Sequence, residues 1–99
     1  MSTEKVRAGR RIMKAARVFL LMEQSELAAA ARVSNPTLSA FELGKVKPQQ
    51  LTRLAIQDAL EARGIVFTNG GKPGFYFDRD RVRVPVSNSP ETDDADERE

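Results

Sequence analysis

One stretch, residues 24–42, constrains the fold more than any other part of this 99-residue chain. Its first eight residues are strong helix formers with the exception of Ser25, and they include four consecutive alanines. Arg32 and Val33 follow at what reads as a sharp corner, and Ser34 then has the side chain of a helix N-cap. The pattern therefore predicts two short helices that meet at a corner.

The second of these helices is expected to end at Gly44, because glycine readily adopts the positive φ of a helix C-cap. Five residues lie where two helices crossing at a steep angle would bury them together: Leu27, Ala28, Val33, Leu38 and Phe41. Ala28 matters because it is small, and a larger side chain there would push the two helices apart. This spacing predicts a helix-turn-helix.

The stretch resembles the helix-turn-helix family of phage repressors and Cro-type proteins, the XRE-like regulators. The positions that carry the resemblance are Gln24, Leu27, Ala28, Ala31, Val33, Ser34, Thr37, Leu38, Ser39, Glu42, Gly44 and Pro48. The likeness continues beyond the motif and covers residues 6–77. It implies a mainly α fold, a lambda-repressor-like helix-turn-helix bundle of four to five helices with a short C-terminal β-hairpin.

Two positions depart from the family pattern. The corner usually carries glycine, whereas this chain has Arg32, and a non-glycine residue with positive φ costs on the order of 1 kcal/mol. The residue before the first helix of the motif is usually Ser or Thr; here it is Glu23, whose carboxylate still suits the helix dipole. The resemblance also implies a largely buried ion pair between Arg17 and Glu42, and we expect Glu42 to be structural for that reason.

The composition narrows the chemistry. The chain has no cysteine and no histidine, which removes disulfides, thiolate nucleophiles, the usual zinc sites and the commonest general base. No cluster of nucleophile, base and oxyanion donors is visible, so we expect no enzyme activity, no catalytic residue, no metal and no cofactor. The longest apolar run, Val18 to Met22, is too short to cross a bilayer, and we expect a cytoplasmic protein without a membrane partner.

The net charge of +2 conceals a polarised chain. Residues 1–63 hold 11 Lys or Arg against 6 Asp or Glu, whereas residues 86–99 hold 1 against 6. We therefore divide the chain into a basic helix-turn-helix domain at 1–64, a hairpin or extended segment at 65–86 suited to dimerisation, and a tail at 87–99. The tail is acidic and has nothing to bury, so we expect it to be disordered.

A first helix is expected to run from a cap at Ser2 or Thr3 to about Met22. Gly9 inside it costs about 1 kcal/mol relative to Ala, so fraying before Arg10 is an alternative. Its apolar face comprises Val6, Ile12, Met13, Ala16, Phe19 and Leu20. Basic residues crowd the rest of its surface: Lys5, Arg7, Arg10, Arg11 and Lys14. Two interpretations of these basic residues remain open, a solvated helix face and contact with DNA phosphates.

A closing helix is expected from Gln49 or Gln50 to Arg63, where Gly64 stops it. Its core face comprises Leu51, Leu54, Ala55, Ile56, Ala59 and Leu60. Strands are then expected at 65–68 and 75–77 around a glycine-rich turn, with a third, edge strand at 82–86. Because a hairpin alone is marginal in water, its aromatic residues should pack on the helices or on a second chain.

The geometry of a recognition helix in the major groove selects the candidate DNA-binding residues. On that geometry the residues that face DNA are Asn35, Pro36, Thr37, Ser39 and Ala40. The other candidates, assigned as positioning contacts, are Gln24, Ser34, Lys45 and Lys47. Asn35 is the best candidate for direct readout, since its amide can pair with adenine, but it is also a competing N-cap ahead of Pro36. Pro36 and Ala40 offer only apolar contact, so sequence preference should depend in part on DNA shape.

Positioning contacts to the DNA backbone are assigned to five of these residues, of which Ser34 and Thr37 offer hydroxyl groups. The resemblance implies that Gln24 touches a phosphate, and Lys45 and Lys47 directly follow the reading helix. For the two lysines, ordinary solubilising charge is the alternative. With Z phosphate contacts, the logarithm of affinity should fall against the logarithm of salt concentration with a slope of about −0.9Z.

These observations favour a sequence-specific DNA-binding transcriptional regulator. We expect a repressor that binds a palindromic operator in double-stranded DNA as a homodimer, through the major groove. The alternative is an antitoxin-type protein that binds a partner protein through its C-terminal segment and uses DNA binding for autoregulation. A purely structural role of the helix-turn-helix is a third possibility.

Overall fold

The computed structural model describes residues 6–69 and 71–86. Within these residues the chain forms four helices followed by a two-stranded antiparallel sheet. The elements are α1 (Arg10–Phe19), α2 (Gln24–Ala31), α3 (Asn35–Leu43), α4 (Gln50–Glu61), β1 (Arg63–Thr68) and β2 (Gly74–Val82). The prediction of a mainly α chain with a C-terminal hairpin is confirmed, and the predicted tail at 87–99 lies outside the described residues.

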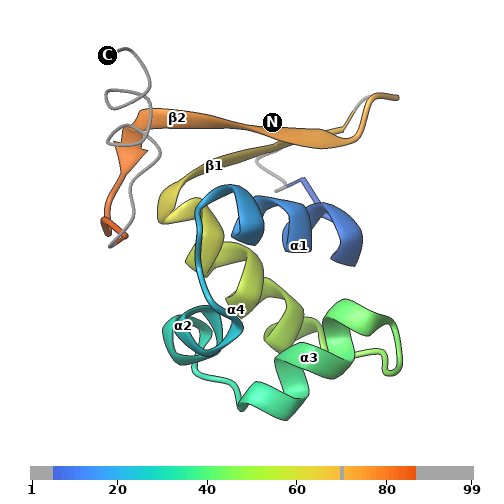
Figure 1. Ribbon diagram of the computed structural model, residues 1–99. Helices are drawn as coiled ribbons and strands as arrows, with labels where there is room; N and C mark the ends of the chain where they lie inside the picture. The colour runs from blue at the N-terminus through green and yellow to red at the C-terminus, as the bar shows by residue number, and fades with distance from the viewer. Residues whose placement is uncertain (1–5, 70, 87–99) are drawn as a thin grey trace.

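The hairpin lies along one side of the helices, next to α1, while α2 and α3 occupy the opposite end of the molecule (Figure 1). A single hydrophobic core joins these parts. Five of the helices and strands each contribute a side chain that is at most 1% exposed: Met13, Leu27, Leu38, Leu60 and Ile65. The core therefore fixes the ends of α2 and α3 relative to the rest of the chain.

The first helix is shorter than the sequence predicted. It begins at Arg10, with Gly9 as an extended N-cap (φ −80°, ψ 163°), and it ends at Phe19 instead of Met22. The predicted cap at Ser2 or Thr3 lies outside the described residues. Leu21, with φ of 60°, turns the chain toward α2.

Side chains of α4 hold the segment before α1 in an extended conformation. The backbone N–H of Ala8 donates to Gln57 Oε1 at 3.2 Å, and Arg53 Nη1 donates to the carbonyl of Ala8 at 3.0 Å. Gln57 Nε2 also donates to the carbonyl of Val6. The predicted helix start at Ser2 or Thr3 was wrong, and the helix begins where Gly9 allowed it to fray. The partners that hold residues 6–8 lie more than 40 residues away in sequence, where a local pattern cannot reveal them.

Gly64 lies inside β1 and does not end the closing helix, which stops at Glu61. Its φ is 97°, and an added Cβ would lie 2.7 Å from Phe77 Cε1 and 3.0 Å from the carbonyl oxygen of Asp78. The register of the hairpin shifts between Arg63 and Ile65, so Gly64 sits at a bulge. A glycine that can adopt positive φ serves a helix end or a bulge equally well, which explains the wrong boundary.

The hairpin pairs Ile65 with Phe77 and Phe67 with Phe75, as the predicted strands require. Strand β2 is longer than predicted and already includes Val82. The predicted third strand at 82–86 is wrong for the described residues. The N–H groups of residues 83 and 84 instead both donate to the carbonyl of Ala62, at 2.7 and 2.9 Å. The chain after β2 is thus held at the end of α4.

Aromatic side chains attach the hairpin to α1. The ring of Phe19 lies 5.7 Å from that of Phe75 and 5.8 Å from that of Phe77, measured between centroids. The expectation that hairpin aromatics pack on the helices is confirmed for these two residues. Tyr76, between them, is 51% exposed on the other face of the sheet.

Leu51 was predicted to face the core, but it is 77% exposed. The buried positions of α4 begin only at Arg53, so the first turn of this helix extends past the core. None of the helices in the described part of the chain has the length and apolar character that crossing a membrane requires.

Candidate nucleic-acid interface

Local interactions define the corner between α2 and α3. At the start of α2, the N–H of Glu23 donates to Glu26 Oε1 at 2.8 Å, which satisfies one of the free groups at the helix end. At its end, Arg32 adopts the left-handed conformation with φ of 61° and ψ of 41°. The positive φ expected at the corner is therefore present in a non-glycine residue. Such backbone strain persists only where the surrounding structure, here the two packed helices, imposes the conformation.

Ser34 is the N-cap of α3. Its Oγ accepts a hydrogen bond from the N–H of Thr37 at 3.2 Å and donates to Thr37 Oγ1 at 2.8 Å. Asn35 is the first residue of the helix, so the alternative in which Asn35 is the N-cap is wrong. The side chain of Asn35 is exposed, and α3 ends as predicted at Gly44, whose φ is 77°.

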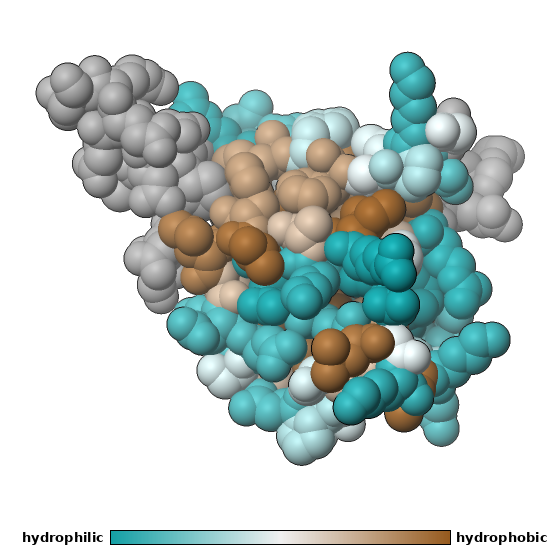
Figure 2. Space-filling model, turned by 45° about the vertical axis from the view of Figure 1, so that its right-hand side comes forward, coloured by the Kyte–Doolittle hydropathy of each residue, from teal (hydrophilic) through white to brown (hydrophobic). Residues whose placement is uncertain are grey.

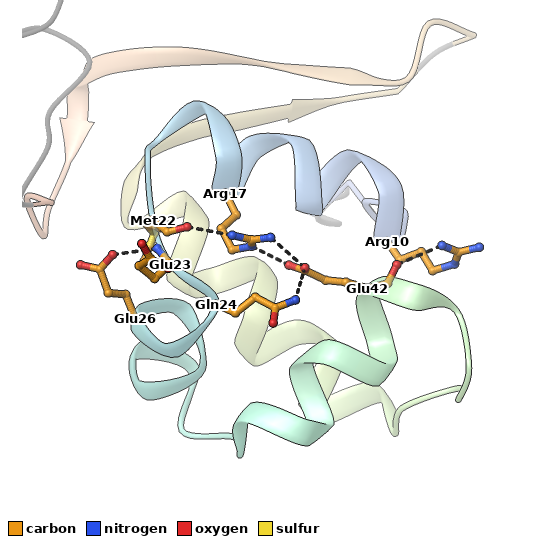
Figure 3. A network of polar contacts seen from close by, with 7 residues as sticks. All are labelled: Arg10, Arg17, Met22, Glu23, Gln24, Glu26 and Glu42. Atoms are coloured by element: carbon orange, nitrogen blue, oxygen red, sulfur yellow. Dashed lines mark hydrogen bonds and ion pairs between the residues drawn. The ribbon is translucent and has the colours of Figure 1, made fainter.

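A buried ion pair fixes α3 to the helices behind it (Figure 3). Arg17 Nε lies 2.8 Å from Glu42 Oε2, and Arg17 Nη2 donates to Glu42 Oε1 at 3.0 Å. The carboxylate also accepts from Gln24 Nε2 at 2.8 Å, and Arg17 Nη1 donates to the carbonyl of Met22 at 2.8 Å. Arg10 Nη1 donates to the carbonyl of Glu42 at 3.1 Å. The predicted pair between Arg17 and Glu42 is confirmed.

The environment keeps Glu42 charged even though only 4% of it is exposed. Burial raises the pKa of this carboxyl, but the hydrogen bonds from Arg17 and Gln24 and the charges of Arg17 and Lys14 lower it, and the net result is a pKa below 4.5. Glu42 is therefore ionised at neutral pH and is fully used in holding three helices together. It is a structural residue.

The candidate residues from the sequence lie in three places. Ser34, Asn35, Pro36, Thr37, Ser39 and Ala40 belong to the cap and the first two turns of α3, Gln24 begins α2, and Lys45 and Lys47 follow the end of α3. Ser34, Asn35, Pro36 and both lysines are exposed, while Gln24, Thr37, Ser39 and Ala40 are half-buried. The structure brings Ser34 and Thr37 into direct contact and ties Gln24 to α3 through Glu42. The lysines stand at the far end of α3, roughly 13 Å along its axis from Asn35.

Positive charge flanks α3 but is absent from it. The only charged residue of α3 is Glu42, which is buried and paired. A groove beside the end of α3 is lined by three basic residues of α1, namely Arg10, Arg11 and Lys14. Figure 2 shows hydrophilic side chains over most of the helical part of this side of the molecule, with small hydrophobic patches between them. The carboxyl end of α3, at Glu42 and Leu43, therefore lies next to cations of α1.

Sequence reasoning missed Arg53. This residue of α4 is 7% exposed, and it lines a cleft together with Lys45 and Lys47. A signal was present in the sequence, because position 53 lies three, four and seven residues before the buried positions 56, 57 and 60. An arginine on the core face of a helix is unusual, because arginine is almost never fully buried unless it is paired.

The surface of α3 and the following loop thus offers an amide, hydroxyl groups and exposed ammonium groups. These groups can hydrogen-bond to base edges and neutralise phosphates. A scan against protein-family models and a search of curated proteins both found no match to this chain.

Proposed function

We propose that this protein is a sequence-specific DNA-binding transcriptional regulator of the phage-repressor and Cro (XRE-like) type. In this proposal α2 and α3 are a helix-turn-helix within a lambda-repressor-like bundle, and α3 is the recognition helix. The protein acts in the cytoplasm as a repressor. It does no chemistry on DNA and excludes polymerase by occupying the operator.

The observation that carries the proposal is the contrast between the two sides of α3. On the inner side, Leu38 is 0% exposed and the carboxylate of Glu42 is held by hydrogen bonds from two other helices. On the outer side, Asn35 and Pro36 are exposed at the amino end of the helix. A rigidly held helix with an exposed amino end is what insertion into a major groove requires.

Six of the candidate residues have a role in this proposal. Asn35 pairs with a base edge, adenine being the partner that its amide fits best, while Pro36 and Ala40 make apolar contact with the groove. Lys45 and Lys47 contact the phosphate backbone. Gln24 uses one N–H of its amide for Glu42, and the second N–H on the same nitrogen remains available for a phosphate.

Homodimerisation is part of the proposal, because one copy of α3 reads only a half-site. The hairpin is the surface that we assign to it. Tyr76 is 51% exposed on the outer face of the sheet, and each strand of the described two-stranded sheet has an unpaired edge. An unpaired edge is a ready template for pairing with a second copy.

Selection of bound sequences from random DNA with the purified protein tests the proposal. The expected result is an enriched palindrome whose half-sites are centred about one helical turn, roughly 34 Å, apart. Enrichment of no sequence, with equal binding to all DNA, would contradict it. Enrichment of a single half-site would support sequence-specific DNA binding but contradict binding as a homodimer.

The role of Asn35 is tested in the same selection with Asn35→Ala. This variant should change the preferred base at one position in each half-site, at a cost of about 1–3 kcal/mol toward the original sequence. Asn69→Ala is the matched control, because Asn69 is an exposed asparagine at the distant hairpin turn. Equal effects of the two variants would remove Asn35 from the reading surface.

The same exposed hairpin favours one second candidate function. An antitoxin-type protein would bind its partner protein through β1 and β2 and use DNA binding for autoregulation. Tyr76→Ala should then abolish partner binding and leave the selected DNA sequence unchanged. If the variant instead changes the half-site spacing or reduces cooperativity, the hairpin joins two copies of this chain.

A further inference from the structure

A basic cleft of about 600 Å³ lies next to the end of α3. Three segments line it: residues 7–10, Phe41 with residues 44–48 at the end of α3 and in the loop that follows, and Arg53 of α4. These segments are far apart in sequence. The hydrogen bond between Arg53 Nη1 and the carbonyl of Ala8 joins the first to the third, and the one between Arg10 Nη1 and the carbonyl of Glu42 joins the first to α3. The cleft is thus a product of the fold.

Every charged residue among the described ones that line the cleft is basic. These residues are Arg7, Arg10, Lys45, Lys47 and Arg53. Cations gathered around a concave surface focus the electrostatic potential there. The cleft is therefore a place where an anion from outside would be attracted.

Arg53 is an unusual member of this group. It is only 7% exposed, and among the described residues it has hydrogen-bond acceptors but no carboxylate partner. Its Nε is buried and donates to no acceptor in the described part of the chain. Burial and the charge of Arg7 both lower the pKa of this guanidinium. No carboxylate among the described residues compensates its charge. A buried charge that keeps an unused donor is stabilised by a ligand of opposite sign.

The groups that line the cleft suit an oxyanion with several acceptor oxygens. Arg10 is held in place by the carbonyl of Glu42, and a side chain on Gly44 would lie 2.6–2.7 Å from the guanidinium of Arg10. The backbone at Gly44 therefore lies directly against one wall of the cleft. Guanidinium groups favour phosphate because their N–H groups match its oxygens in pairs.

We propose that this cleft binds a phosphate oxyanion, with Arg53 at its base and Arg7, Lys45 and Lys47 at its rim. Two sources can supply the same chemistry. One is a backbone phosphate of DNA lying along α3, and this version rests on the proposed function. The other is a free phosphate-bearing small molecule, which would bind without DNA and would regulate access to the same surface.

The first experiment uses sodium pyrophosphate as the probe and the full chain without DNA. Amide chemical shifts are followed by NMR during a titration at constant ionic strength. We expect saturable shifts at residues 8–10 and 45–47, and at least a fivefold weaker affinity in Arg7→Gln. Lys72→Gln, which removes the same charge at the exposed hairpin turn, should change the affinity less than twofold. Equal weakening in both variants would reduce the effect to diffuse charge and overturn the proposal of a site.

The second experiment identifies the source of the phosphate. The affinities of wild type, Arg7→Gln and Lys72→Gln for a selected duplex are measured over a range of salt concentrations. A lower salt slope in Arg7→Gln alone, by about 0.9, assigns the cleft to a DNA phosphate. Identical DNA binding by both variants, with pyrophosphate affinity lost only in Arg7→Gln, assigns it to a free anion. The absence of both effects overturns the proposal.

Failure of the cleft and failure of the proposed function give different results. If the wild type binds no DNA but binds pyrophosphate saturably, the proposal of an anion site is supported and the proposed regulatory function is contradicted. Arg53→Met should abolish pyrophosphate binding in either case. Should Arg53→Met not fold, Lys45→Gln replaces it, because Lys45 is exposed at the rim and its loss should also weaken the binding at least threefold.

Discussion

Two arginines whose side chains are largely shielded from solvent have different partners in this small protein. Arg17 has a side chain that is 11% exposed, and it meets the carboxylate of Glu42 with two hydrogen bonds. Arg53 is about equally buried, yet among the described residues it meets only the carbonyl of Ala8 and the amide oxygen of Gln57. Burial alone therefore does not say what a charged residue does.

The difference is whether a counter-ion within the fold neutralises the charge of the guanidinium. The pair of Arg17 and Glu42 is neutral as a whole and joins α1, α2 and α3, so it sets the position of α3. Arg53 fastens the segment before α1 with neutral acceptors and keeps its positive charge. Arg17 therefore belongs to a structural ion pair, whereas Arg53 leaves an uncompensated charge beside a cleft at the surface.

The largest effect on stability is expected when the ion pair between Arg17 and Glu42 is removed. Glu42→Ala leaves the buried guanidinium of Arg17 without its counter-ion, which typically costs about 3–5 kcal/mol of the free energy of unfolding. Urea denaturation measures this loss. Asp80→Ala, the removal of an exposed carboxylate, should change stability by less than about 0.5 kcal/mol. A similar small effect for both variants would show that α3 is held by apolar packing alone.

A smaller, pH-dependent effect is expected from the same pair. Because the pKa of Glu42 in the folded chain is below its ordinary value of 4.5, its contribution to stability is complete above that pH. The contribution is lost progressively as the pH falls through the lowered pKa. The stability difference between wild type and Glu42→Gln should therefore shrink as the pH falls below 4.5. A difference that is constant down to about pH 2 would contradict this assignment.

Arg53→Met sharpens the comparison from the other side. The substitution removes two hydrogen bonds from a charged donor, each worth about 1.5–3 kcal/mol. It also removes an uncompensated buried charge, which offsets much of that loss. The expected net loss is about 1–2 kcal/mol, clearly less than for Glu42→Ala. Urea denaturation in a buffer without phosphate measures it. A loss as large as that of Glu42→Ala would mean that Arg53 stabilises the fold as strongly as the ion pair does.

The smallest effect is expected at an exposed arginine that belongs to neither class. Arg32 has φ of 61°, a conformation that favours glycine. Arg32→Gly should therefore raise the free energy of unfolding by about 0.5–1 kcal/mol, reduced by the greater freedom of glycine in the unfolded chain. Thermal denaturation checks the direction. A loss of stability would show that the Arg32 side chain makes a contribution of its own.

The sequence predicted the parts of the molecule that depend on neighbouring residues. The cap at Ser34, the helix end at Gly44 and the corner at Arg32 are all decided within a few residues, and each is present. The pair of Arg17 and Glu42 lies 25 residues apart, and it was found only through a family resemblance.

The errors concern contacts that are distant in sequence. The start of α1 was misplaced because Arg53 and Gln57 hold the backbone of Ala8 from 45 and 49 residues away. Gly64 was mistaken for a helix end because the shift of register that needs it involves the opposite strand. The cleft at Arg53 was missed for the same reason, since its lining comes from three separate segments.

The salt dependence of DNA affinity tests the central claim most directly, namely that α3 is presented outward on a basic surface shaped for a duplex. Titration of the wild-type protein with its selected duplex should give a logarithm of affinity that falls linearly with the logarithm of salt concentration. With Lys45, Lys47 and Gln24 as backbone contacts on each copy, only the two lysines release counter-ions, and the slope should be about −2 per copy. An affinity that is independent of salt would contradict the account.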